Sequence, residues 1–319
     1  MTNKITVICP VYNEESYIKD VLEFCVKSEP KNKEIIFIDG ASEDKTVNII
    51  REYQAIYDNI NLYHNPDRYV PFALNKALKY AKTNLIVRID AHTKYADDYF
   101  LTILKTFDEI DADIVGGPYR IAYKNQFQKV VGIAISSKVG VGGSKVHDIS
   151  FRGYVDSVAY GAWKKGLFDD IGYFDERLMR NQDDELHYRA KSKGKKIFLN
   201  PDIKLWYYPR ETYSSLFRQY YQYGLFKPLV IRKVKSEIKL RHIIPLLFVI
   251  YLFVLPISIM LFSIYLVIPL LIYLVLILGF SLIQKEINFL DKMKLVIITF
   301  LIHFGYGLGF LLGIKKLFK

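Results

Sequence analysis

Charged side chains are missing from one long stretch of the chain, because residues 243–283 contain none. As a helix, these 41 residues would extend roughly 60 Å, about twice the hydrocarbon thickness of a bilayer. We therefore predict a helical hairpin that crosses a membrane twice. A second apolar run, residues 295–314, is just long enough for a third span, which its closely spaced glycines favour. Three lysines follow that run, and the positive-inside rule disfavours placing them outside, so two and three spans both stay open.

Cysteine is also scarce. Cys9 and Cys25 are the only cysteines, too few for a disulfide framework and compatible with a reducing compartment. The apolar run at the N-terminus is too short, and is followed too soon by acidic residues, to be a secretory signal peptide. We expect the part of the chain that precedes the apolar tail to lie in the cytosol.

The positive charge is confined to the region around the apolar tail. Of the net charge of +11, residues 218–241 carry +6 and residues 242–319 carry +4, which leaves +1 for residues 1–217. Cationic residues at the ends of spans meet anionic headgroups on the cytoplasmic side. The first 217 residues lack the basic surface that nucleic-acid binding requires, so a nucleic-acid partner is not expected.

The glycine-rich phosphate loops of dinucleotide-binding folds and of P-loop proteins are absent from the sequence. What is present is an alternation of short apolar runs with helical patterns. Strands are predicted at residues 5–9, 34–38, 60–64 and 85–89, with helices from residue 45 and over residues 71–82. This order predicts an α/β fold with a doubly wound, mostly parallel sheet.

Polar residues follow two of these strands. Asp90 and His92 would face the same side if the strand geometry continued, and together could hold a divalent cation that binds a diphosphate. A strand followed by an ordinary polar turn is the alternative. Asp39, at the end of another strand and next to Gly40, could accept hydrogen bonds from a nucleobase or ribose, although a plain turn explains it equally well.

Further along the chain, Trp163 could stack on a sugar ring or be an ordinary core aromatic. Three consecutive acids, Asp183, Asp184 and Glu185, precede a predicted helix over residues 187–193. They could serve a site, stabilise the helix N-terminus, or belong to a solvated surface.

Several motifs in this order resemble the GT-A domain of family 2 glycosyltransferases: PVYNE at 10–14, IDGASEDKT at 38–46 and DAH at 90–92. Four others are similar to the bacterial exopolysaccharide branch typified by succinoglycan glucosyltransferases. They are RIDAH at 88–92, GGP at 116–118, RNQDDEL at 180–186 and RQYYQYGLFK at 218–227. The resemblance covers about residues 4–230 and the tail.

The resemblance implies a role for each matching position. The nucleotide-sugar would contact Pro10, Val11, Tyr12, Asn13, Glu14, Asp39 and Asp90. Asp90 and His92 would correspond to the D-x-D metal motif for Mn²⁺ or Mg²⁺, with a histidine in place of the second acid. Asp183 would be the catalytic base, although Gln182 replaces the glutamate that precedes it in the family. The acceptor would contact Gly161, Ala162, Trp163, Asp184, Gln219, Gln222 and Tyr223. Gln222 and Tyr223 stand where processive members carry Arg and Trp, which argues against a processive polymerase.

These expectations combine into one hypothesis. Residues 1–217 form a cytosolic GT-A catalytic domain, residues 218–242 a basic juxtamembrane segment, and residues 243–319 a membrane domain of two or three helices. The protein would be an inverting enzyme that moves a hexose from a nucleotide sugar, expected to be UDP-linked, to a lipid-linked glycan in exopolysaccharide, capsule or surface-glycan synthesis. One alternative is a synthase that uses polyprenyl phosphate itself as acceptor. A second is a non-catalytic membrane protein with a nucleotide-sugar-binding head.

Overall fold

The computed structural model describes residues 5–234 and 238–318, and these form two compact units. One unit comprises residues 1–120 and 145–207, and the other comprises residues 121–144 and 208–319, apart from the residues not described. Residues 121–144 therefore group with the C-terminal helices, although they lie well before the predicted boundary at residue 217. The functional assignment of the three predicted segments stays a prediction.

The first unit is built on an eight-stranded sheet with the strand order β3-β2-β1-β4-β9-β6-β10-β8. β1 (Thr6–Val11), β2 (Glu34–Asp39), β3 (Ile60–His64) and β4 (Leu85–Arg88) run parallel to one another. β9 (Ala162–Lys164) runs antiparallel between β4 and β6 (Ile114–Gly116), which pairs in parallel with β10 (Ile197–Leu199). β8 (Gly153–Tyr154) is the edge strand and pairs antiparallel with β10. The predicted α/β fold and all four predicted strands are confirmed.

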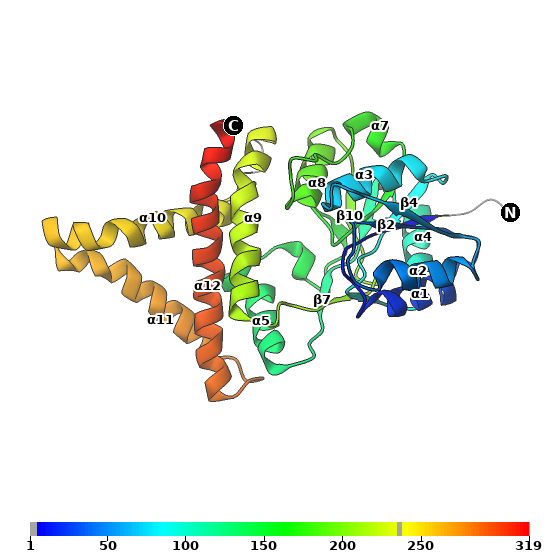
Figure 1. Cartoon of the computed structure of the whole chain (residues 1–319). Helices are drawn as coiled ribbons and strands as arrows, with labels where there is room; N and C mark the ends of the chain where they lie inside the picture. The colour runs from blue at the N-terminus through cyan, green and yellow to red at the C-terminus, as the bar shows by residue number, and fades with distance from the viewer. Residues whose placement is uncertain (1–4, 235–237, 319) are drawn as a thin grey trace. The chain divides into compact units, whose positions relative to one another are not determined.

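Both faces of this sheet are covered, which explains why its strands are almost uniformly apolar. Val7, Cys9 and Val11 of β1 pack into one core with α1 (Ile18–Lys27), α2 (Thr46–Gln54) and α4 (Tyr99–Glu109). Ile8 packs on the opposite side with α3 (Val70–Tyr80), α7 (Leu167–Ile171) and α8 (Gln182–Ser192) (Figure 1). The parallel strands end at one edge of the sheet, where the chain leaves the core. A separate three-stranded sheet has the order β5 (Thr93–Tyr95), β11 (Leu205–Tyr207), β7 (Tyr119–Ile121).

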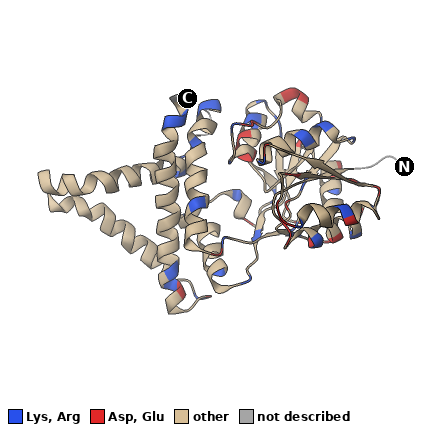
Figure 2. Cartoon of the chain, in the orientation of Figure 1, with Lys and Arg blue, Asp and Glu red and all other residues tan. Residues whose placement is uncertain are grey.

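The second unit is helical in the residues described. It contains α5 (Gln126–Ser136), α6 (Lys138–Val141), α9 (Tyr213–Lys233), α10 (Leu240–Leu261), α11 (Ile268–Leu282) and α12 (Phe289–Gly313). Three helical stretches are long and apolar enough to cross a membrane: Leu240–Leu261, Ile264–Leu282 and Phe289–Leu317. The first two form the predicted hairpin, which carries no lysine, arginine or acid over residues 243–283 (Figure 2).

One motif has a structural explanation here. Gly117 follows β6, and a Cβ atom at this position would lie 1.8 Å from the backbone carbonyl oxygen of Ile203. The glycine is required because two backbone segments approach too closely for any side chain. Gly117 of the GGP motif is therefore required for packing at the end of β6.

We expect Gly117→Ala to lower the free energy of unfolding by about 1–3 kcal/mol, the usual cost of overpacking. Gly166→Ala is the matched control, because no atom lies within 4 Å of a Cβ placed there. The midpoint of thermal unfolding of the purified protein in detergent measures both. Equal midpoints for the two variants would contradict the close contact at Gly117.

Candidate active site

The loops that follow β1 and β2 are joined by hydrogen bonds at the carboxyl ends of the strands. The backbone NH of Asn13 donates to Ser42 Oγ at 2.9 Å, and the NH of Glu43 donates to Asn13 Oδ1 at 2.8 Å. The NH of Glu14 donates to Thr46 Oγ1 at 2.8 Å. The motifs at 10–14 and 38–46 thus form one polar rim, as ligand sites of parallel sheets do.

Asp39 lies at the end of β2 with its carboxylate almost fully buried. It accepts hydrogen bonds from the backbone NH groups of Ala41 and Ser42, at 3.1 and 3.2 Å. These bonds match the plain-turn interpretation of this aspartate. Pro10 and Val11 lie within β1, whereas Tyr12 is exposed with the Arg68 guanidinium 5.8 Å from its ring centroid. Contact of these residues with a nucleotide stays a prediction.

The centre of the site is the guanidinium of Arg88, the last residue of β4. Its Nη1 donates to both carboxylate oxygens of Asp183, at 2.6 and 2.7 Å. Its Nε and Nη2 donate to the two carboxylate oxygens of Asp90, at 2.9 and 3.2 Å. One cation therefore connects two carboxylates, one of them 95 residues away along the chain.

Burial governs the electrostatics of this triad. The side chain of Arg88 is 5% exposed, whereas that of Asp183 is 30% exposed. Burial tends to lower the pKa of the guanidinium, but Asp183 and Asp90 hold that pKa above its ordinary value. Burial raises the pKa of the Asp183 carboxyl, Arg88 counteracts this rise, and Asp90 adds to it. Asp183 is thus a partly exposed carboxylate whose proton affinity depends on its neighbours, as for residues that transfer protons.

Asp90 and His92 do not continue the strand, so the premise of extended geometry is wrong. The chain turns at this point, and the NH of Thr93 donates to the carbonyl oxygen of Asp90 at 3.3 Å. His92 Nδ1 instead lies 3.0 Å from Glu14 Oε1. A carboxylate bound to one ring nitrogen is the usual partner of a metal-ligating histidine, because it fixes the orientation of the ring.

No group of three or more His, Cys, Asp and Glu side chains that could hold a metal ion is found among the described residues. This donor set still fits Mg²⁺ or Mn²⁺ bound with a substrate. Such ions are held by one or two protein ligands together with phosphate oxygens and water, rather than by a complete protein cage. Asp90 would supply an oxygen, since a carboxylate paired with Arg88 retains further lone pairs.

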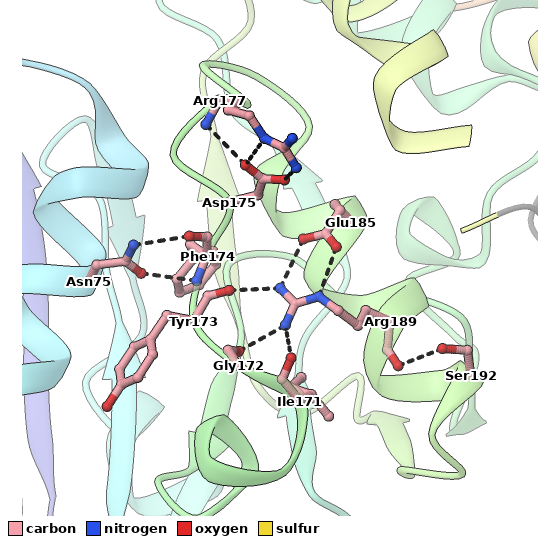
Figure 3. Close-up of polar contacts among 10 residues, drawn as sticks. All are labelled: Asn75, Ile171, Gly172, Tyr173, Phe174, Asp175, Arg177, Glu185, Arg189 and Ser192. Atoms are coloured by element: carbon pink, nitrogen blue, oxygen red, sulfur yellow. Dashed lines mark hydrogen bonds and ion pairs between the residues drawn. The ribbon is translucent and has the colours of Figure 1, made fainter. Parts of the chain in front are cut away.

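α8 carries Asp183 in its first turn and is anchored through Arg189 (Figure 3). Arg189 donates to both oxygens of the fully buried Glu185, at 2.8 and 2.9 Å, and to the backbone carbonyl oxygens of residues 171–173. Arg189 therefore attaches α8 to the preceding segment, and Glu185 orients the guanidinium of Arg189 for these contacts. The acids at 183–185 lie inside the first turn of α8, so this helix begins five residues earlier than the predicted start at residue 187.

The loop that precedes α8 is fixed to α3 as well. Asn75 Nδ2 donates to the carbonyl oxygen of Phe174 at 3.0 Å, and the NH of Phe174 donates to Asn75 Oδ1 at 2.9 Å (Figure 3). A side-chain amide thus replaces a backbone partner for a buried loop. Both attachments hold the start of α8 opposite the end of β4.

Comparison with known proteins identifies the family. Residues 6–160 match the family Glycosyl transferase family 2. The succinoglycan biosynthesis protein ExoA of Rhizobium meliloti (strain 1021) is 30% identical over 243 residues, which cover 75% of this chain and 74% of that protein. The chain belongs to glycosyltransferase family 2.

Two further proteins are similar to this family 2 glycosyltransferase. The dolichyl N-acetyl-alpha-D-glucosaminyl phosphate 3-beta-D-2,3-diacetamido-2,3-dideoxy-beta-D-glucuronosyltransferase of Methanococcus voltae is 30% identical over 241 residues, covering 72% of this chain and 75% of that protein. The solved structure of the mannosyltransferase PcManGT from Pyrobaculum calidifontis, in complex with GDP-Man and Mn²⁺, superposes with a TM-score of 0.66. It is 17% identical and covers 96% of this chain and 86% of that one, a likeness that shows the GT-A fold.

Part of the predicted acceptor site of this glycosyltransferase is wrong. Trp163 lies in β9 and is fully buried, with its ring packed edge-on against Phe168 and Phe174. It cannot stack on a sugar, and the core interpretation holds. The side chain of Ala162 is fully buried as well, so neither side chain reaches an acceptor. The carbonyl oxygen of Gly161 accepts a hydrogen bond from the backbone NH of Arg88 at 3.2 Å. Gly161 therefore supports the site through its backbone.

The remaining acceptor candidates lie on two helices. Asp184 is in the first turn of α8, next to Asp183. Gln219, Gln222 and Tyr223 lie on α9 in the other compact unit, where Gln219 Nε2 donates to Tyr223 Oη at 3.0 Å. Their contact with an acceptor stays a prediction.

Sequence reasoning missed three contributions to the site. They are Arg88 as the connecting cation, the pairing of Glu14 with His92, and Tyr160, whose ring centroid lies 5.5 Å from the Arg88 guanidinium. An arginine at the end of a buried strand was the one available signal, because a charge at such a position needs partners.

We expect Arg88→Gln to destabilise the first unit, because two neighbouring carboxylates would lose their shared cation. The cost should be at the lower end of about 3–5 kcal/mol, since both carboxylates retain some solvent. Arg88→Lys should fold better but lose activity, because an ammonium cannot bind both carboxylates in the forked geometry. Thermal unfolding and transfer assays measure the two effects. Arg177→Gln, which removes a surface arginine paired with Asp175, is the control and should match the parent.

Proposed function

We propose that this glycosyltransferase transfers a hexose from a UDP-sugar, with inversion, to a hydroxyl of a lipid-linked glycan on the cytosolic side of a membrane. The observation that carries this proposal is the Asp90–Arg88–Asp183 triad at the carboxyl end of the parallel strands. It pairs a carboxylate suited to a donor diphosphate with one suited to an acceptor proton. Inversion follows from a single attack opposite the leaving diphosphate, which requires a base but no protein nucleophile.

Asp183 is the proposed general base. Its carboxylate is the most exposed member of the triad, and Arg88 holds it in a fixed orientation. It would accept the proton of the acceptor hydroxyl as the oxygen attacks the anomeric carbon. A positioned base of this kind contributes about 10²–10⁴-fold to the rate.

Asp90 and His92 would hold Mn²⁺ or Mg²⁺, with Glu14 orienting the imidazole through its contact with Nδ1. The bound ion would neutralise charge that develops on the diphosphate. The loops at 10–14 and 38–46 would bind the nucleoside, with Asp39 facing the base. The PcManGT complex with GDP-Man and Mn²⁺ supports a nucleotide sugar and a divalent ion as ligands of this fold.

The membrane location and the acceptor are proposed together. The apolar hairpin Leu240–Leu261 and Ile264–Leu282 would cross the bilayer, with its basic flanks in the cytosol beside soluble nucleotide sugars. A membrane-bound enzyme and a lipid-linked acceptor lie in the same membrane, so the enzyme can reach the acceptor there. The name of the Methanococcus voltae relative includes a sugar linked to dolichyl phosphate, which supports an acceptor of this class over bare polyprenyl phosphate.

The deciding experiment is a screen of labelled UDP- and GDP-sugars with the purified protein. Each donor is tested with lipid-linked glycans extracted from the membranes of the source cells and, separately, with polyprenyl phosphate. We expect transfer from a UDP-hexose to the lipid-linked glycans alone. A labelled product from polyprenyl phosphate would instead establish the monosaccharide synthase, and failure of all donors would refute the proposed reaction.

A pair of variants tests the base. Asp183→Asn keeps the size of the side chain, so donor binding should stay near that of the parent while transfer slows at least about 10²-fold. Asp184→Asn is the matched control, one residue further along the same helix turn. Calorimetry with UDP measures binding, and labelled-sugar transfer measures turnover. If Asp184→Asn loses most of the transfer activity and Asp183→Asn loses little, the general base is Asp184 and not Asp183.

A second set tests the ion. Chelator should abolish transfer, and Mn²⁺ should restore it. Spin-resonance titration with UDP should show that Asp90→Ala loses Mn²⁺ and that His92→Asp retains it, because an oxygen ligand suits a hard ion. Glu14→Gln should weaken Mn²⁺ binding about 10–100-fold, the usual effect of removing an orienting partner. Unchanged Mn²⁺ affinity in Asp90→Ala would remove this residue from the site.

A further inference from the structure

The C-terminal half of α12 packs backbone to backbone against α9. A Cβ atom at Gly309 would lie 2.0 Å from the carbonyl oxygen of Tyr221, and one at Gly313 would lie 2.4 Å from that of Leu225. Gly224 of α9 approaches Tyr306 of α12 equally closely, at 2.0 Å. The contacting residue numbers increase together in the two helices, so α9 and α12 run parallel and side by side (Figure 1). No lipid chain can separate helices in such contact.

The N-terminal half of α12 contacts α5 and α6. Gln126 Nε2 donates to Asp291 Oδ2 at 2.8 Å, and Lys129 Nζ donates to the carbonyl oxygen of Glu286 at 2.8 Å. Near the middle of α12, His303 Nε2 donates to the carbonyl oxygen of Val139 at 2.9 Å. Protein with polar side chains therefore flanks α12 along most of its length.

These partners are not suited to a hydrocarbon environment. α9 carries Arg218 within the stretch that contacts α12 and Lys227 and Arg232 further along the same helix, and α5 carries Lys129. If α12 crossed the bilayer, these helices would have to enter the bilayer with it. Charged side chains at that depth are costly and rare, so this packing argues against a transmembrane position for α12.

α10 and α11 have a different environment. Only 11% of the apolar window of each is buried in protein, against 44% for α12. α10 contacts α12 near Gly307, where a Cβ would lie 2.0 Å from the carbonyl oxygen of Pro245. Beyond that contact its outer residues are mostly exposed, and Figure 1 shows the α10–α11 pair extending away from α12 rather than along it.

The most exposed side chains of α12 are apolar. Leu290, Ile297 and Leu312 are exposed and lie on one side of the helix, seven and fifteen residues apart. This exposed face lies opposite the face that α5, α6 and α9 cover with protein. A helix that has protein on one side and an apolar surface on the other can bury that surface in the membrane interface.

We propose that α12 lies in the plane of the membrane interface, with α5, α6 and α9 on its protein side, and that only the α10–α11 hairpin crosses the bilayer. Lys315 and Lys316 then stay on the same side as Lys292 and Lys294, which satisfies the positive-inside rule. The lipid surface is thus the partner of the Leu290–Ile297–Leu312 stripe. The in-plane position of α12 does not depend on the proposed function. Only the statement that this side of the membrane faces the cytosol rests on it.

Cysteine accessibility tests this topology in the full chain, after Cys9 and Cys25 are replaced by serine. Single cysteines are introduced as Phe262→Cys between α10 and α11, Lys285→Cys before α12, and Lys315→Cys after it. An impermeant maleimide should label positions 285 and 315 from one side and position 262 from the other. Labelling of 315 together with 262 would overturn the proposal. If 285 and 315 share the external side, the in-plane helix stands and the proposed orientation fails.

Depth measurements give a second readout. Nitroxide labels at Leu290, Ile297 and Leu312 should report the same shallow depth, because an in-plane helix stays at one level. The matched series Leu247, Val254 and Leu261 on α10 should pass through the bilayer centre. All six side chains are exposed in the fold, so labelling should not disturb packing. A depth maximum at Ile297 would show that α12 spans the bilayer.

Discussion

The first unit is organised around a buried guanidinium. Removing the charge of Arg88 from water is costly, and the fold offsets that cost with two carboxylates and a tyrosine ring. Because the partners come from β4 and α8, the same ion pairs connect segments that are distant in sequence. They also fix the distance between the carboxylate proposed for the diphosphate and the one proposed for the acceptor. Structural cohesion and catalytic geometry are therefore provided by the same contacts.

The surrounding fold makes that triad possible. Parallel strands buried on both faces end at one edge, and the loops that leave them must satisfy their own backbone groups there. Asn13 and Asp39 do so with hydrogen bonds across and within the loops. A polar rim thus forms before any ligand binds, and it is rigid because each side chain is held by a neighbouring backbone group. Short motifs that are weak signals separately become one surface in the folded chain.

The sequence predicts the parallel strands well, because a strand buried on both faces is apolar at every position. It predicts less well wherever a tertiary partner decides the outcome. Trp163 was assigned to the acceptor because nothing local shows that β9 lies between two other strands. The pairing of Arg88 with Asp183 depends on a contact across 95 residues, which no local pattern reveals. Glu14 was expected near the nucleotide, and its contact with His92 shows how a turn can redirect a side chain that strand geometry would place elsewhere.

The same limit applies to the membrane region. Hydropathy averages over a helix, so it cannot separate a helix surrounded by lipid from one with protein on one side. The glycines of α12 favoured a membrane span because small residues let spans approach closely. In the fold these glycines allow α9 to pack closely against α12, and α9 carries charged residues along its length. Close packing is therefore the correct interpretation of the glycines, and the identity of the partner reverses what that packing implies for topology.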